Sequence, residues 1–416
     1  MTRDRRSTRI SRRGFVAGAA AVAAGVAPFN IVRAQGAALK VGVILPRSGG
    51  QAFLGQSCQR GADITPAVLK SIGYPVNIEL MSADTETSVE TARARAEKLI
   101  NEGAQVLVGP FDSGQAGAIA QVAEQRGVPF VINIAAAPQI TEQGYKFVFR
   151  NFPTSVHLVV NGLTLFKDLF AATGKSPKTA VFMHVNDTFG QANKAAIDRI
   201  FPTLDMPFKI LDTISYDPAA RDLSVEVAKA KATGADILML VSRLNDAILL
   251  VREMVKQRWE PMGIISPGSP GMYEQQFFDT LQKYSEHCIS NVPWYNPKSK
   301  LLSPVREAFE KQFPRDKFEG HVFNVGFTFE AILTAADAFK RAGSGDGKAL
   351  ADAIRQTDIA EGLMVSKGIR FDAKGQNVGI GSAALQNRNM RATVVLPKAV
   401  AEAEPIFPMP GWSQRG

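Results

Sequence analysis

The stretch LKVGVIL at residues 39–45 decides the fold class of this chain. It is aliphatic or β-branched apart from Lys40 and Gly42, and a helical pattern follows over residues 55–71. A short run that is apolar on both faces is typical of a strand inside a parallel sheet, because helices cover both faces of such a sheet. We therefore expect a buried strand that leads into a crossover helix.

The same unit of a strand followed by a helix repeats along the first part of the chain. Further strands are expected at residues 76–80, 106–109 and 128–134, and further helices at residues 87–101 and 114–126. Alternation at this spacing indicates parallel βαβ units. The first lobe is therefore predicted to be a doubly wound α/β layer.

A second lobe of the same kind is expected after Asn151-Phe152-Pro153, beginning with a long helix at residues 155–172. Its other elements are expected as strands at 179–185, 208–215, 237–241 and 263–266, and as helices at 190–200, 221–233 and 245–258. The roughly 380 residues after position 34 exceed what one hydrophobic core usually spans. The sequence thus predicts an α/β protein with two doubly wound parallel-sheet lobes.

The last part of the chain has a different pattern. Helices are expected at residues 303–312 and 325–341, followed by an extended stretch at 369–395. In that stretch Asp372-Ala373-Lys374-Gly375 has the composition of a tight turn, which predicts an antiparallel hairpin. From Pro405 onward the Pro- and Gly-rich composition indicates an irregular tail.

The first 34 residues are typical of an export signal. Ser11-Arg12-Arg13-Gly14-Phe15 precedes a weakly apolar run, and we expect cleavage after Ala34. The paired arginines resemble a twin-arginine signal, and a Sec signal or a basic tail on a cytosolic protein are the alternatives. Removing this segment, which holds seven arginines and one aspartate, lowers the formal net charge from +9 to +3. No basic cluster interleaved with aromatic residues is left, so no nucleic-acid partner is expected.

Catalytic and metal-binding motifs are missing from the sequence. The four histidines are scattered, and neither an HExxH nor a GxSxG pattern occurs. Cys58 and Cys288 lie far apart and in different predicted lobes, which favours two buried free thiols over a disulfide. We expect no metal, no cofactor and no enzymatic activity, although a secreted enzyme stays open as an alternative.

Five segments, in this order, carry a resemblance to a known family. They are VGVILPRSGGQAFLGQ (41–56), LVGPFDSGQA (107–116), PFVINIAAAPQIT (129–141), FRNFPTS (149–155) and HVNDTFGQ (184–191). Together they resemble the branched-chain-amino-acid class of periplasmic solute-binding proteins, from about Lys40 to Gln386.

This resemblance implies a type I periplasmic binding fold with three crossover segments, near Asn151–Pro153, Val292–Trp294 and Ser366–Phe371. Its implied parts are lobe 1 at residues 38–152 and 293–365, lobe 2 at 153–292 and 366–400, and a C-terminal tail at 401–416. Such a protein would be a periplasmic monomer that closes over a small amino-acid-like or carboxylate solute and delivers it to an ABC permease. A ligand sensor of the same fold and a binder of an amide- or urea-like solute are the alternatives.

Ligands of open α/β sheets bind beyond the carboxyl ends of the strands, which selects candidate residues in the first lobe. Ser48 lies in the glycine-containing loop after the first strand, and Phe53 lies near the start of the next helix. Ser113 lies at a helix start, where a hydroxyl and free backbone amides can hold a carboxylate, or where it serves only as an N-cap. Ala135 and Ala136 expose backbone groups at another strand end, unless they only fill a tight turn.

The second lobe supplies Phe189 and Arg243. The resemblance implies that an aromatic residue at position 189 closes over the ligand, with a phenyl ring here where tyrosine is frequent. Arg243 follows an apolar strand and could direct its guanidinium at a carboxylate, or could be a solvated surface residue.

Gly268 also belongs to the candidate site, in a loop where the resemblance implies an acidic residue that pairs with a ligand ammonium. No Asp or Glu occurs between Ser266 and Tyr273. A buried ammonium without a carboxylate partner is costly. We therefore expect a ligand that lacks an α-amine, unless Asp187 supplies the missing charge.

Overall fold

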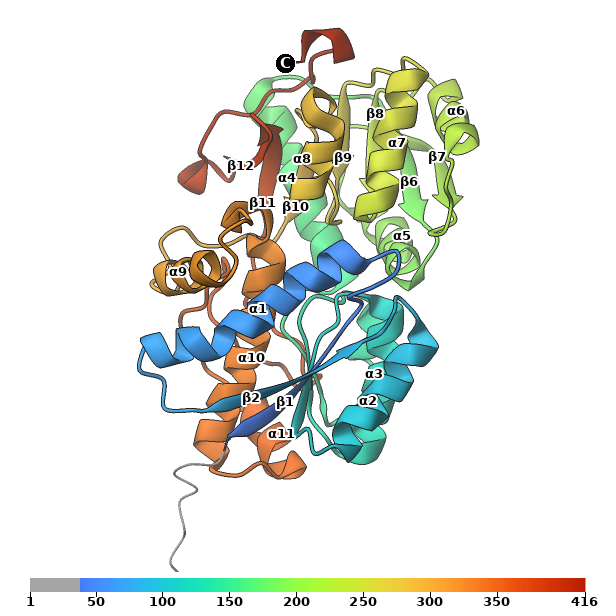
Figure 1. Ribbon diagram of the computed structural model, residues 1–416. Coiled ribbons are helices and arrows are strands. Elements are labelled where there is room, and N and C mark those ends of the chain that lie inside the picture. Colours follow the sequence, from blue (N-terminus) through green and yellow to red (C-terminus); the bar gives the residue numbers. More distant parts are fainter. Residues whose placement is uncertain (1–37, 416) are drawn as a thin grey trace, which may run out of the picture. The chain divides into compact units, whose positions relative to one another are not determined.

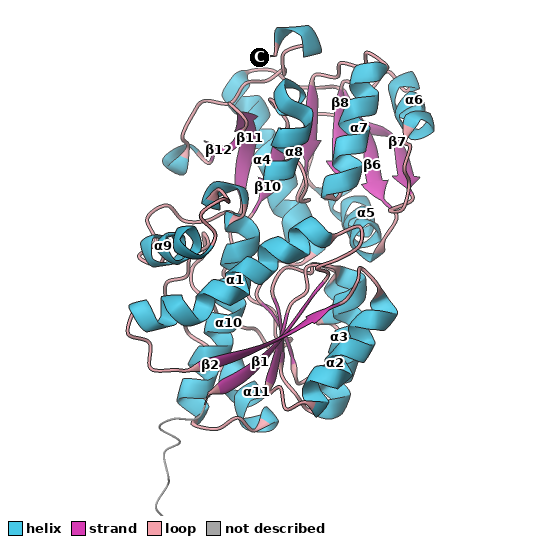
Figure 2. Cartoon of the chain, viewed as in Figure 1, coloured by secondary structure: helices cyan, strands magenta, loops and turns pink. Residues whose placement is uncertain are grey.

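Two separate sheets, each flanked by helices, make up residues 38–415, which are the residues that the computed structural model describes (Figure 1). Figure 2 shows helices on both faces of the sheets. The expected export signal at residues 1–34 lies outside the described residues. The α/β fold class with parallel sheets, predicted from the repeated strands and helices, is confirmed.

The first sheet is entirely parallel and has the strand order β2-β1-β3-β4-β5. Its strands are β1 (Leu39–Leu45), β2 (Ile78–Asp84), β3 (Val106–Val108), β4 (Phe130–Ile132) and β5 (Val148–Arg150). The flanking helices are α1 (Ala52–Ser71), α2 (Val89–Asn101), α3 (Ser113–Arg126), α9 (Leu302–Gln312), α10 (Val322–Ala342) and α11 (Gly347–Arg355). Val41 and Val43 pack in the core that includes α1 and α10, whereas Ile44 packs with α2 and α3. Both faces of β1 are buried, which explains its continuous apolar sequence.

The second sheet has the order β12-β11-β10-β9-β8-β6-β7 and is parallel from β10 to β7. Its strands are β6 (Thr179–Val185), β7 (Lys209–Tyr216), β8 (Ile237–Val241), β9 (Gly263–Ser266), β10 (Ile289–Val292), β11 (Ala383–Arg388) and β12 (Arg391–Leu396). The flanking helices are α4 (Ser155–Thr173), α5 (Thr188–Ile200), α6 (Ser224–Ala232), α7 (Leu244–Lys256) and α8 (Gln275–Leu281). Short 3-10 helices lie at Pro138–Ile140, Phe201–Thr203, Gln282–Ser285, Phe318–Gly320, Lys398–Val400 and Trp412–Gln414.

The chain runs between the two sheets in three places: from β5 to α4, from β10 to α9, and from α11 to β11. We use lobe 1 for the first sheet with its helices and lobe 2 for the second sheet with its helices. The exact domain limits expected from the resemblance remain a prediction. Helix α10 is long and apolar enough to cross a membrane, but 94% of its most apolar window is buried inside the fold, so it serves as a core helix.

The expected hairpin around Asp372–Gly375 is not where the last strands pair. Strands β11 and β12 turn at Asn389 and Met390, which both have left-handed φ angles of 54° and 57°. The segment at 372–375 does form a tight turn, closed by the Gly375 amide on the Asp372 carbonyl at 2.9 Å. Antiparallel pairing does flank this turn, with Phe371 opposite Asn377 and the Val378 amide donating to the Arg370 carbonyl at 3.2 Å, so a short hairpin forms there as expected. Gln376 of the same segment pairs with Arg150, next to the first crossing.

Several other elements differ from the sequence prediction. Strand β2 starts at Ile78 and continues to Asp84, later than the expected 76–80. Strands β5 and β10 and helices α8 and α11 were not expected. The two strands have three and four residues, and α8 has seven, so each is too short to show a clear period in the sequence.

Cys58 in α1 and Cys288 before β10 are both buried and free, as expected from their spacing. Burial raises the pKa of Cys58 to about 12 and that of Cys288 to about 11. Both thiols therefore stay protonated at neutral pH and act as small apolar side chains.

The C-terminal tail is irregular, as expected, but it packs against lobe 2. Phe407, Met409 and Trp412 are buried, and the Trp412 indole N–H donates to the Trp259 carbonyl at 2.8 Å. The guanidinium of Arg415 stacks over the Trp412 ring at 3.8 Å. The tail therefore contributes to the core of lobe 2.

We predict that Trp412→Ala lowers the free energy of unfolding by about 3–5 kcal/mol, because it removes a buried aromatic side chain and its hydrogen bond. Urea unfolding followed by circular dichroism measures this. The control is Val400→Ala at a 41% exposed position, which should change stability by less than about 0.5 kcal/mol. Equal losses in the two variants would contradict the packing role of the tail.

Candidate functional site

A pocket of about 400 Å³ lies where the carboxyl ends of the strands of the two lobes meet. Its lining residues are Leu54, Phe111, Ile134, Phe152, Phe189, Arg243, Gly268, Pro270, Tyr273, Val292, Phe323 and Asn324. They follow β1, β3, β4 and β5 in lobe 1 and β6, β8 and β9 in lobe 2, or belong to β10 and α10. The carboxyl-terminal edge of the sheets is where small ligands bind in α/β folds.

Five of the twelve residues that line the pocket are aromatic. Phe152 and Phe323 pack edge to face with ring centroids 5.9 Å apart, and Tyr273 lies 5.3 Å from Phe323. Phe111 and Phe189 line the pocket from lobe 1 and lobe 2 respectively. Rigid rings of this kind favour a flat or branched apolar body in the ligand.

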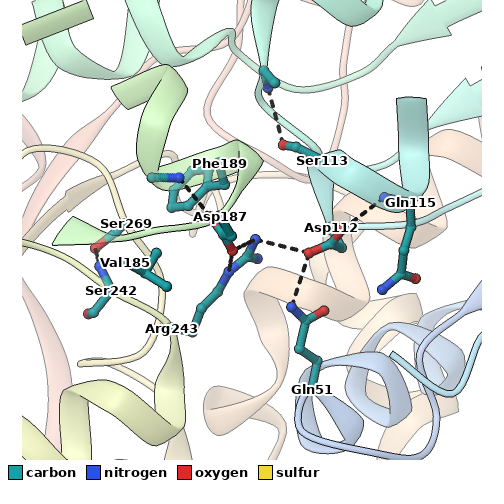
Figure 3. A network of polar contacts seen from close by, with 12 residues as sticks. Gln51, Asp112, Ser113, Gln115, Val185, Asp187, Phe189, Ser242, Arg243 and Ser269 are labelled. Carbon is teal, nitrogen blue, oxygen red and sulfur yellow. Dashed lines mark hydrogen bonds and ion pairs between the residues drawn. The ribbon is translucent and has the colours of Figure 1, made fainter. Parts of the chain in front are cut away.

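Arg243 is the one charged residue in this pocket lining, and it is paired with two carboxylates (Figure 3). Its Nη2 atom lies 2.8 Å from Asp187 Oδ2 and 3.1 Å from Asp112 Oδ2, and its Nε atom donates to Asp187 Oδ2 at 3.1 Å. Burial opposes the charge of the guanidinium, but the carboxylates of Asp187 and Asp112 outweigh burial and raise the pKa of Arg243. Arg243 is therefore a buried, paired cation and not a solvated surface residue.

Each of the two aspartates is also a helix N-cap. Asp112 Oδ1 accepts from the Gln115 amide at 2.9 Å at the start of α3. Asp187 Oδ1 accepts from the Gly190 amide at 2.7 Å at the start of α5. An aspartate is stabilising at a helix N-terminus because it satisfies a free amide and faces the positive end of the helix dipole. The caps therefore fix where both carboxylates stand.

A buried acid, Glu274, lies next to the pocket at the N-cap of α8. Its two carboxylate oxygens accept from the side-chain amide of Asn324 at 3.3 Å, and Asn324 lines the pocket from α10 of lobe 1. Burial raises the pKa of Glu274 to about 8, while the Asn324 hydrogen bond works in the opposite direction. The neighbouring Tyr273 hydroxyl is buried and has no hydrogen-bond partner within residues 38–415.

The structure brings three of the predicted site residues into the pocket wall: Phe189, Arg243 and Gly268. Gly268 has φ +141°, and a Cβ there would lie 2.8 Å from the Leu158 Cβ, so the loop requires glycine. Phe53 lines a neighbouring pocket of about 520 Å³ that also includes Arg243.

The other predicted residues lie outside the pocket wall. The Ser113 hydroxyl accepts from the Ala136 amide at 3.2 Å, and Ser113, Ala135 and Ala136 are all buried behind the lining. Ser48 is exposed, and its amide donates to Asp84 Oδ1 at 3.2 Å. A role in binding remains a prediction for all of these residues.

Sequence reasoning missed most of the lining. Its members are mainly apolar or aromatic: Leu54, Phe111, Ile134, Phe152, Pro270, Tyr273, Val292, Phe323 and Asn324. In a sequence, apolar residues of a pocket look the same as residues of a core. For Glu274 the sequence does contain a signal, because this acid directly follows Tyr273, at the end of the loop where the resemblance implies an acidic residue.

We predict that Glu274→Gln removes a pH dependence of stability. In the folded wild type, Glu274 keeps its proton up to about pH 8. In the unfolded chain, a glutamate loses its proton at about pH 4.3. The free energy of unfolding should therefore fall as pH rises between these values, by up to about 1.4 kcal/mol per pH unit. Urea unfolding at a series of pH values measures this, with Glu310→Gln at an exposed position as the control. Identical profiles for the wild type and Glu274→Gln would refute the assignment.

Comparison with known proteins identifies the family of this chain. The family model described as periplasmic binding protein matches residues 38–387. The "Leu/Ile/Val-binding protein homolog 7" of Brucella suis biovar 1 (strain 1330) is 25% identical over 402 residues, covering 94% of this chain and 97% of the relative.

Solved structures share the fold. A leucine-binding protein from Thermotoga maritima has a TM-score of 0.73 at 21% identity, covering 86% of this chain and 97% of its own. A solute-binding protein of an ABC transporter from R. palustris, in complex with benzoate, has a TM-score of 0.71 at 19% identity, covering 90% of this chain and 97% of its own. The family match spans most of the described residues, and the chain therefore belongs to the periplasmic binding protein family.

Proposed function

We propose that this protein is the solute-binding component of an ABC importer, which captures a small amino-acid-like or carboxylate solute between its lobes and delivers it to a membrane permease. The observation that carries the proposal is the pocket, because both lobes contribute to its wall. A ligand held by both lobes stabilises the closed form relative to the open form, and a permease can recognise that form.

The pocket lining supports a ligand with an apolar, flat or branched body. Phe111, Phe152, Phe189, Tyr273 and Phe323 supply apolar surface, while few polar atoms face the space between them. One similar structure contains benzoate and another belongs to a leucine-binding protein, and both ligands fit this description. The buried acid Glu274 lies beside the pocket through Asn324, and this keeps ligands with an amine within the proposed class.

Membership of a periplasmic binding family implies that the protein is exported. A cleavable signal ending at Ala34, the twin-arginine route, the permease partner and the monomeric state are parts of the same proposal. A binding protein of this kind has no need for a catalytic group, and we propose no enzymatic activity.

The first test is a thermal-shift screen of the purified protein against amino acids, aromatic and aliphatic carboxylates, and the corresponding amides. A ligand at about 100 times its Kd should add about 2.7 kcal/mol to the free energy of unfolding and raise Tm. We expect a shift with an apolar amino acid or an apolar carboxylate. Hydrolysis of any of these compounds, without a saturable shift, would contradict the transport role.

We predict that Ser113→Ala weakens ligand binding about tenfold, because the Ser113 hydroxyl accepts from the amides of Ala136 and Ala137 and so fixes the loop after Ile134, which lines the pocket. Isothermal titration with the best ligand of the screen measures the Kd. Ser303→Ala is the matched control, since this exposed hydroxyl of α9 donates to Glu307 and does not line the pocket, and it should leave the Kd unchanged. Similar losses in both variants would remove Ser113 from the site.

The same titration tests the aromatic wall through Phe189→Ala. We expect this variant to weaken binding more than Ser113→Ala, because the removed ring lines the pocket directly. Thermal unfolding without ligand controls for damage to the fold. An unchanged Kd would show that the ligand binds elsewhere.

A further inference from the structure

Arg243 is in contact with both lobes at once (Figure 3). It lies between β8 and α7, and Asp187 lies between β6 and α5, so these two residues share lobe 2. Asp112 lies between β3 and α3 in lobe 1. The 3.1 Å contact between Arg243 Nη2 and Asp112 Oδ2 is therefore an ion pair between the lobes.

The Arg243 guanidinium is already paired with two carboxylates. Asp112 and Asp187 together carry two negative charges against one positive charge, and the side chains of the three residues are only 9–17% exposed. A ligand carboxylate at the same guanidinium would be a third negative charge in a poorly hydrated place. Like charges at such distances repel strongly when water is excluded.

We propose that Arg243 is a positioning residue, a latch that joins the N-terminus of α3 in lobe 1 to the N-terminus of α5 in lobe 2 when the cleft is closed. This inference rests on the proposed function, because it concerns the closure that traps the solute. It assigns Arg243 a role other than holding a ligand carboxylate. Asp187 orients the guanidinium within lobe 2, and Asp112 receives it from lobe 1.

Each residue of the ion pair between the lobes is held in place by another residue of its own lobe. The Gln51 side-chain amide of lobe 1 donates to Asp112 Oδ2 at 3.0 Å, while Asp187 holds Arg243 in lobe 2. A second contact between the lobes lies beside the ion pair, where the side-chain amide of Asn245 donates to the Gly50 carbonyl at 2.7 Å. The latch is therefore a preorganised contact and not two flexible side chains that happen to meet.

The latch also sets the distance between two walls of the pocket. The Arg243 guanidinium carbon lies 4.9 Å from the centre of the Phe189 ring of lobe 2 and 5.8 Å from that of the Phe111 ring of lobe 1. Both rings line the pocket. Because the Arg243 guanidinium contacts both rings, forming the ion pair also brings Phe111 and Phe189 to opposite sides of that guanidinium.

The helix caps provide a matched pair of variants, Asp112→Asn and Asp187→Asn. Asparagine is as good an N-cap as aspartate, so each helix start is retained. Because the cap uses Oδ1, the side-chain NH₂ of the new asparagine faces the guanidinium, and a donor then meets a donor. Asp112→Asn removes the pair between the lobes, whereas Asp187→Asn removes a pair inside lobe 2.

The deciding experiment is small-angle X-ray scattering of the purified protein without added solute, followed by titration with benzoate and with benzamide. We expect Asp112→Asn to have a larger radius of gyration than both the wild type and Asp187→Asn. We also expect Asp112→Asn to weaken whichever of the two solutes binds, and to weaken both by the same factor of about tenfold where both bind, because a latch acts on closure and not on ligand charge.

Two results would overturn the inference. One is a radius of gyration for Asp112→Asn equal to that of the wild type. The other is tighter binding of benzoate, but not of benzamide, by Asp112→Asn, which would mean that Asp112 competes with a ligand carboxylate for Arg243. The scattering measurement needs no ligand, so it decides the latch even where the solute screen fails and the transport proposal falls.

Discussion

The pocket depends on one constraint, the common direction of strands in a parallel sheet. Every strand of such a sheet ends at the same edge, so the loops and the N-termini of the following helices gather there. In this protein the loops at that edge of lobe 1 and of lobe 2 line one pocket. Side chains far apart in the sequence, such as Phe111 and Tyr273, thereby come to share one cavity.

The capping aspartates of the helices at this edge bring buried negative charge close to the pocket. Asp112 and Asp187 cap two helices from opposite lobes, and Arg243 neutralises part of their charge. Buried ions are tolerated where they are paired and hydrogen-bonded. Glu274 avoids being an unpaired buried charge in another way. Burial raises its pKa to about 8 and so keeps it protonated and neutral at neutral pH.

The crossing region is held by a second buried arginine. The Arg150 guanidinium donates to the carbonyls of Ala135 and Ala137 at 3.1 and 2.7 Å and to the Gln376 side chain at 2.7 Å. Burial lowers its pKa to about 9. This residue ties the end of β5 to the third crossing and fixes the loop whose amides face Ser113, so the geometry of the crossing and that of the pocket are linked.

The sequence by itself determined the α/β class, the two lobes and the sheet edge at which the pocket lies, because apolar strand runs and helix patterns are local signals of burial. It also pointed to Phe189, Arg243 and Gly268, which all follow strands. Only the tertiary structure decided that Arg243 faces two carboxylates, that four phenylalanines meet in one pocket wall and that Ser48 stays outside it. Those facts depend on contacts between residues far apart in the sequence, such as Asp112 and Arg243 at a separation of 131 positions, and no local pattern encodes such contacts.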